Sequence, residues 1–103
     1  AIAMGADAIA VATGALLALG CQQYRICGSG NCPMGIATQN PQLRQRLDVN
    51  AAAQRVANYL KVCNEELKMF ARITGHSDIH QLSVHDLITT SREISEFTNI
   101  PHA

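Results

Sequence analysis

Three of the four cysteines lie within twelve residues, in the stretch CQQYRICGSGNCPMG that covers residues 21–35. Glycine, asparagine and proline surround them, and this irregular composition continues to residue 40. Loops longer than about 12–15 residues are uncommon inside a compact domain and are usually functional. The fold of this cysteine loop, residues 21–40, therefore depends on what its thiols bind.

Several uses of these thiols are open. A disulfide framework is disfavoured because nothing indicates secretion and because Cys63 lies on the apolar stripe of a predicted helix. Structural zinc prefers CxxC pairs, often with His, whereas the spacing here is C-x5-C-x4-C and no His occurs between residues 21 and 75. A third use is a catalytic thiol at Cys32, with its thiolate favoured by backbone N–H groups.

An iron–sulfur cluster fits the loop best, since each iron needs thiolate sulfur and several cysteines must converge. Gly28, Gly30 and Gly35 let the backbone wrap around a cluster and direct N–H groups at its sulfides. Pro33, directly after Cys32, resembles the Cys-Pro ending of ferredoxin motifs. Three ligands suit a three-iron cluster, and a four-iron cluster with one open corner is the alternative.

The residues before the loop predict an α/β unit. Residues 1–4 read as the last turn of a helix, and the continuous apolar run at 8–12 is typical of a strand buried on both faces. A short helix over 15–19 follows and ends at Gly20. A single parallel strand cannot satisfy its own backbone hydrogen bonds, so its neighbours must come from elsewhere.

The residues after the loop predict helices. Asn40 should cap a short helix over 41–47, and Asn50 should cap a long one over 51–74. The long helix carries one apolar stripe, made of Ala53, Val56, Leu60, Cys63, Leu67, Phe70 and Thr74. Beyond it we expect a capping box from Ser83 to Asp86 and then a polar tail that ends in an extended segment.

Composition excludes several classes of protein. The net charge is zero and Trp is absent, which disfavours nucleic-acid binding and anionic membranes. The apolar opening contains Asp7 and three glycines and lacks a signal peptide's basic start, so we expect neither a membrane span nor secretion but a cytoplasmic protein. Only 16% of residues are charged, against about 25% typically, which predicts a surface covered by another domain or subunit. The first residue is not Met, and we expect a piece of a longer chain.

Residues 15–47, ALLALGCQQYRICGSGNCPMGIATQNPQLRQRL, resemble the iron–sulfur loop of the FMN-binding synthase domain of the glutamate synthase large subunit. In that family a strand of the form GADAxxxxT, a short helix and Gly-Cys lead into C-x5-C-x4-C-P-x-G-(I/V)-A. The resemblance covers nearly the whole chain, and the loop is most similar to archaeal-type, stand-alone synthase domains. The chain departs from the family at Gly28-Ser29-Gly30 and at Met34, and neither change touches a ligand.

The resemblance implies an α/β fold: the C-terminal part of an FMN-binding (β/α)8 barrel with a mostly helical tail, the piece itself being mainly α. It divides the chain into the last β/α unit of the barrel at 1–20, the cluster loop at 21–40 and a helical extension at 41–103. The implied metal ligands are Cys21, Cys27 and Cys32, holding a 3Fe–4S cluster or alternatively a 4Fe–4S cluster. The implied FMN phosphate contacts are Thr13, Gly14 and Ala15.

The activity implied is the reductive synthesis of L-glutamate from 2-oxoglutarate and glutamine-derived ammonia, with the cluster relaying electrons to FMN. The implied partners are the remainder of the barrel, a glutaminase domain or subunit, and ferredoxin or a pyridine-nucleotide-dependent electron donor. A full barrel needs about 250 residues. We therefore expect no catalytic residue in this chain and no synthase activity from it alone. The alternatives are a barrel enzyme with Cys32 as catalytic thiol and a structural zinc-binding module.

Overall fold

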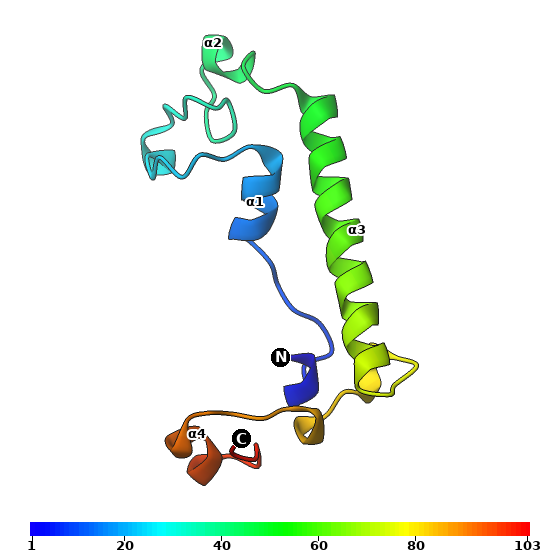
Figure 1. Ribbon diagram of the computed structural model, residues 1–103. Helices are drawn as coiled ribbons and strands as arrows, with labels where there is room; N and C mark the ends of the chain where they lie inside the picture. Colours follow the sequence, from blue (N-terminus) through cyan, green and yellow to red (C-terminus); the bar gives the residue numbers. More distant parts are fainter. The chain divides into compact units, whose positions relative to one another are not determined.

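The computed structural model describes residues 1–103, and regular structure in it is entirely helical (Figure 1). Four α-helices and four 3₁₀ turns follow one another along the chain. They are η1 (Ile2–Met4), α1 (Thr13–Leu19), η2 (Cys27–Ser29), α2 (Pro41–Arg44), α3 (Val49–Ile73), η3 (Ile79–Gln81), η4 (Val84–Asp86) and α4 (Arg92–Phe97). The mainly α character predicted for the chain is confirmed. No helix combines the length and the apolar character needed to cross a membrane.

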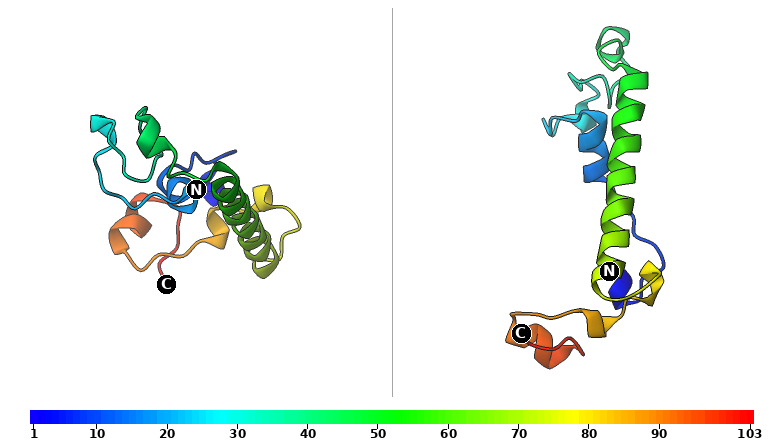
Figure 2. Two further views of the ribbon diagram at one scale, coloured as in Figure 1. Left: turned by 90° about the horizontal axis from the view of Figure 1, so that it is seen from above. Right: turned by 45° about the vertical axis from the view of Figure 1, so that its right-hand side comes forward.

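The chain divides into two compact units. The loop unit, residues 11–63, holds α1, the cysteine loop, α2 and the first part of α3. In it α1 lies beside α3, as the views of Figures 1 and 2 agree. The tail unit, residues 1–10 and 64–103, holds the end of α3 and the remaining elements, with η1 packed against η3 and η4.

Helix ends follow their local signals. Gly20 ends α1 in a left-handed conformation at φ 118°, and its N–H donates to the carbonyls of Leu16 and Leu17. The Asn40 side chain accepts hydrogen bonds from Gln42 and Leu43, as the sequence predicts for the start of α2.

The predicted capping box is also present. The Ser83 hydroxyl accepts from the His85 N–H, and the Asp86 carboxylate accepts from the Ser83 N–H at 2.8 Å. A second box at Asp78 and Gln81 caps η3 in the same way.

Residues 8–12 form no strand, which is where the chain differs most from the sequence prediction. They are exposed, with Ile9 and Val11 more than half accessible. The reason is that a parallel strand exists only through hydrogen bonds to its neighbours, and no second strand lies beside it here.

Two smaller predictions are wrong. Helix α2 ends at Arg44 and not at Leu47. Helix α3 begins at Val49, and its cap is Asp48, whose carboxylate accepts from the Ala51 N–H at 3.0 Å. In the tail, the Ser91 hydroxyl caps α4 by accepting from Ile94, and the non-helical end of the chain follows, where His102 pairs with Thr89 in an isolated bridge.

Little of the apolar surface is buried. Only four apolar residues are buried, Cys32, Ala52, Ala71 and Ile100, and no large side chain is fully enclosed. Leu60 and Phe70, both on the predicted stripe of α3, remain more than half exposed. Each unit therefore leaves large apolar side chains exposed to solvent. The low fraction of charged residues predicts a surface that another domain or subunit covers. The exposed apolar side chains agree with that prediction.

Asp86 is the polar centre of the tail unit and generates a testable prediction. Its pKa is lowered, first by the hydrogen bond from the Ser83 N–H and then by His76, whose Nε2 lies 3.0 Å from both carboxylate oxygens. A lowered folded pKa means that Asp86 stabilises the fold above the unfolded value of about 3.9. The contribution is lost as pH falls through the folded pKa.

We expect Asp86→Asn to speed amide hydrogen exchange at Ser83 and its neighbours at pH 7. The difference from the unchanged protein should shrink as the pH falls through the folded pKa. Glu66→Gln is the control, because Glu66 is an exposed carboxylate with no hydrogen bond. Equal exchange in the Asp86 variant and the unchanged protein would contradict the assignment.

Candidate functional site

The cysteine loop connects α1 to α2 within the loop unit. Its backbone turns sharply, with left-handed conformations at Gly30 and Gly35 and also at Gln23 and Arg25, whose φ angles are 55° and 57°. Such conformations cost of order 1–3 kcal/mol in residues other than glycine and cluster at ligand sites. Two such residues, Gln23 and Arg25, lie between the first and second cysteines. Their conformation indicates that this segment binds a ligand and is not optimised for stability.

Cys21 directly follows the end of α1. Its N–H donates to the Leu16 carbonyl at 3.0 Å, which extends the hydrogen bonding of the helix end to the cysteine itself. Its sulfur accepts a hydrogen bond from the Gln23 N–H at 3.4 Å. The half-buried thiol is therefore oriented by both neighbouring segments.

Cys27 opens the turn η2 and is exposed. The Gly30 N–H donates to its carbonyl at 3.1 Å. The Ser29 hydroxyl donates to the Ile26 carbonyl at 2.8 Å and accepts from the Asn31 N–H. These bonds span at most three residues, so this cysteine is positioned by local structure.

Cys32 is buried, and its surroundings differ most from those of an ordinary thiol. Hydrogen bonds from backbone N–H groups lower the pKa of the Cys32 thiol, first those of Ala37 and Ile36. The amides of Met34 and Gly35 add to this effect, and desolvation opposes it. Lowering the pKa favours the thiolate, which is the form that binds metal or acts as a nucleophile.

The turn after Cys32 is packed against the α2 region. Gly35 has φ 76°, and a methyl group there would lie 2.6 Å from the Leu43 carbonyl oxygen and 3.1 Å from the Leu47 nitrogen. Asn31 and Thr38 pair across this turn in an isolated antiparallel bridge. The buried cysteine therefore sits in a closed turn that only glycine can complete.

The three thiols are free, and no three side chains of His, Cys, Asp or Glu form a group that could hold one metal ion. The tetrahedral site of the zinc alternative is thus not formed by this arrangement. A multi-iron cluster makes a different demand, since each cysteine binds its own iron. Three free thiols in one loop, with amide donors around the third, fit the donor chemistry of such a cluster.

The predicted phosphate contacts lie at the start of α1. Thr13 is exposed, and Gly14 faces Tyr59 of α3 so closely that a methyl group there would overlap the tyrosine hydroxyl. This contact is a structural reason for glycine at position 14. The role of Thr13, Gly14 and Ala15 in binding a phosphate stays a prediction.

The other cysteine and the histidines lie apart from the loop. Cys63 is half-buried on α3. His76 pairs with Asp86. The hydrogen bond from His80 to the Asp7 carbonyl, followed by its contact with Asp78, raises the pKa of His80. The histidines belong to the tail unit, and the three loop cysteines belong to the loop unit.

Two arginines near the loop were not identified from the sequence as site residues. Arg46 donates to the Pro33 carbonyl at 3.2 Å, and Arg55 donates to the Leu19 carbonyl at 3.0 Å. The sequence predicts a solvated or interdomain face for Arg44 and Arg46, with a contact between one of them and the electron donor as the alternative. Bonds across 13 and 36 residues leave no local pattern that could have identified them.

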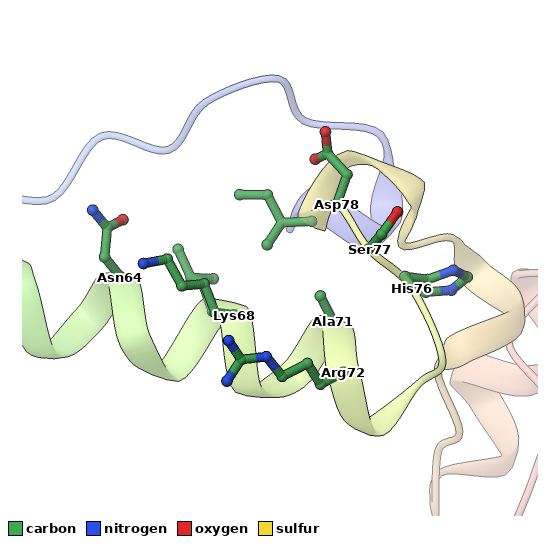
Figure 3. Close-up of a pocket in the computed structure, with 9 residues that line it drawn as sticks. Asn64, Lys68, Ala71, Arg72, His76, Ser77 and Asp78 are labelled. Atoms are coloured by element: carbon green, nitrogen blue, oxygen red, sulfur yellow. The ribbon is translucent and has the colours of Figure 1, made fainter.

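A hollow of about 470 Å³ lies in the tail unit (Figure 3). Asn64 and Lys68 line it from α3, and Asp78 lines it from the segment after that helix. Lys68 is already paired with Glu65 at 2.7 Å. Arg72 and His76 line it as well, and this mixture of an amide, cations, an imidazole and a carboxylate defines no class of ligand. No cysteine takes part in it.

A comparison with known protein families identifies the family of this chain. The family described as "Conserved region in glutamate synthase" matches residues 1–77. The chain therefore belongs to the glutamate synthase family, whose members are oxidoreductases of amino-acid synthesis. The match includes the whole cysteine loop.

Individual relatives agree. An archaeal-type glutamate synthase (NADPH) of Thermotoga neapolitana is 48% identical over 82 residues, covering 80% of this chain and 16% of that protein. The archaeal glutamate synthase (NADPH) of Methanocaldococcus jannaschii is 45% identical over 82 residues, with the same coverage. A glutamate synthase large subunit-like protein of Rhizobium meliloti is 38% identical over 119 residues, covering 100% of this chain and 27% of that protein.

The chain thus spans between about a sixth and a quarter of the length of these relatives. No solved structure matches it.

Gly35→Ala tests the closed turn after Cys32. Alanine would have to adopt a left-handed backbone and push against the Leu43 carbonyl, so we expect a loss of about 1–3 kcal/mol in stability. Gly28→Ala is the matched control, because nothing lies within 4 Å of a methyl group there. Thermal unfolding of the full-length variants measures the difference, and equal midpoints would contradict the packing described.

Proposed function

We propose that this chain is the iron–sulfur segment of a glutamate synthase, in which Cys21, Cys27 and Cys32 hold a 3Fe–4S cluster. The observation that carries the proposal is a loop with three free thiols whose third member lies among amides that favour its thiolate. When bound, such a cluster supplies one-electron transfer to a flavin. A 4Fe–4S cluster with one open corner is the alternative occupant.

The chain's own residues would prepare the ligands. Amides that donate to the Cys32 sulfur stabilise negative charge on it, which favours metal binding at neutral pH and raises the reduction potential of what is bound. The Gln23 N–H donates to the Cys21 sulfur and orients it. Burial of Cys32 limits the access of water to that side of the site.

The start of α1 would contribute to an FMN phosphate site through Thr13, Gly14 and Ala15. Helix N-termini favour anions because their N–H groups have no partner in the helix. Since α1 has seven residues, other donors must complete the site. They would come from the remainder of a (β/α)8 barrel, in which residues 8–12 form the last strand between neighbours that this chain lacks.

The reaction proposed for the full-length protein is the reductive synthesis of L-glutamate from 2-oxoglutarate and glutamine-derived ammonia. NADPH appears in the names of both of these archaeal-type relatives, which supports a pyridine-nucleotide-dependent electron donor, and ferredoxin is the alternative. The ammonia would come from a glutaminase domain or subunit. On this proposal the chain belongs to a cytoplasmic enzyme and supplies a relay, not the residues that bind substrate.

The isolated 103 residues should therefore show no synthase activity. 2-Oxoglutarate, ammonia, FMN and a reductant would be added, and glutamate would be measured against the full-length enzyme. Glutamate formed by the isolated chain would contradict the division of roles.

A second function, a catalytic thiol at Cys32, is favoured by one observation, the lowered pKa of that thiol. It requires one essential cysteine and a colourless protein. The cluster requires all three loop cysteines and a brown protein.

Serine substitutions separate the two. In the full-length protein, purified without oxygen, each of Cys21→Ser, Cys27→Ser and Cys32→Ser should lower iron and acid-labile sulfide by more than half and remove the EPR signal of the oxidised three-iron cluster. Cys63→Ser is the matched control and should keep both. Iron content unaffected by all three loop substitutions would refute the cluster, and loss of activity in Cys32→Ser alone would favour the catalytic thiol.

A further inference from the structure

Two arginines of the loop unit donate hydrogen bonds to the backbone on both sides of the three loop cysteines. Their hydrogen bonds span 13 to 37 residues, whereas the other bonds that shape the loop span few. One arginine acts just before the first cysteine of the loop and the other acts just after the last.

Arg55 fastens the end of α1. Its Nε donates to the Ala18 carbonyl at 3.3 Å and its Nη2 donates to the Leu19 carbonyl at 3.0 Å. These are among the last carbonyls of the helix, which have no partner within it and attract a cation. The planar guanidinium presents its N–H donors in a fixed geometry, and here two of them reach two adjacent carbonyls at once.

Gly20 lets this contact form. It stands between the bonded carbonyls and Cys21, and a methyl group on it would lie 3.3 Å from the Arg55 Nη2. Its left-handed backbone then directs the chain into the loop. The position of Cys21 therefore follows from α1, whose end is tied to α3.

Arg46 contacts the loop on the other side of the three cysteines. Its Nη1 donates to the carbonyl of Pro33, the residue after Cys32, at 3.2 Å. Two residues further on, Gly35 packs against the carbonyls of Leu43 and Arg44. The turn that holds Cys32 is thus attached to the α2 region by a side-chain bond and by close packing.

No such bond reaches the segment between these two points. Around Cys27 the side-chain bonds come from Ser29 and Asn31 and stay within three residues. Hydrogen bonds from distant side chains therefore fix the backbone before Cys21 and after Cys32. Around Cys27 the side-chain hydrogen bonds are local.

We propose that Arg46 and Arg55 are positioning residues that hold Cys32 and Cys21 in place for a cluster, with Cys27 completing the site from the locally shaped segment. The proposal rests on the proposed cluster. Both arginines are exposed, and exposed polar contacts contribute little to global stability. Their effect is therefore expected in the retention of iron and not in the unfolding of the protein.

The test uses the full-length protein with Arg55→Gln, Arg46→Gln and the double variant. The measurement is the rate of iron loss to a chelator without oxygen, together with the EPR line shape of the oxidised sample. Outer partners of metal ligands typically contribute 10–100-fold to metal affinity, so we expect iron loss about tenfold faster in each single variant. The line shape should broaden because the ligand cysteines are less uniformly placed.

Arg44→Gln is the matched control. It removes the same charge from an exposed residue two positions from Arg46, and the Arg44 side chain makes no hydrogen bond. Arg55→Lys should restore part of the retention, because an ammonium can still reach one carbonyl. It also covers the case in which the glutamine variant folds poorly.

The outcomes are distinct. Iron loss at the unchanged rate in both single variants, or equal acceleration in the Arg44 control, overturns the positioning role while the cluster stands. Absence of iron and sulfide from the protein without substitutions overturns the proposed cluster, and with it the positioning role of the two arginines. Faster iron loss in the two variants alone, with unaltered thermal unfolding, supports the proposal.

Discussion

Hydrogen bonds at helix ends fix the conformation of this chain, because almost nothing in it is held by a core. No large side chain is fully buried, so packing cannot select among backbone conformations as it does in a compact domain. The caps at Asn40, Asp48 and Ser91 and the boxes at Asp78 and Ser83 satisfy donors that would otherwise be open. Each fixes one turn of the chain, and together they set where the long helix begins and how the backbone turns after it ends.

The dependence on local bonds explains what could be predicted from the sequence. Gly20, Asn40 and the Ser83–Asp86 box were predicted correctly because their signals lie within a few residues. Asp48 and Ser91 carry the same kind of signal. Asp48 was missed because Asn50, two residues on, is an equally good capping residue.

Features that depend on distant partners behaved differently. The run at 8–12 has the composition of a buried strand, but the structure leaves it unpaired because a strand is a property of a sheet. The hydrogen bonds of Arg46 and Arg55 could not be predicted for the same reason. No sequence pattern near either residue indicates that it donates to a carbonyl far along the chain. The three cysteines were found because their spacing is local, and the amides around Cys32 became apparent only from the structure.

The group that the cysteine loop is proposed to bind would stabilise the loop in the way that a hydrophobic core stabilises a compact domain. Its backbone takes left-handed conformations at Gln23 and Arg25, and nothing in the loop buries enough apolar surface to offset that cost. Metal binding supplies folding free energy in such cases, because ligands that must converge also fix the chain between them. On the proposal that Arg46 and Arg55 position the cysteines, their contacts lower the entropy cost of ordering the loop by fixing the backbone on both sides of the three cysteines beforehand. A loop fixed in this way and closed by the proposed cluster would not need a large core, and in residues 21–40 the only regular structure is the turn η2 and the only buried apolar side chain is that of Cys32.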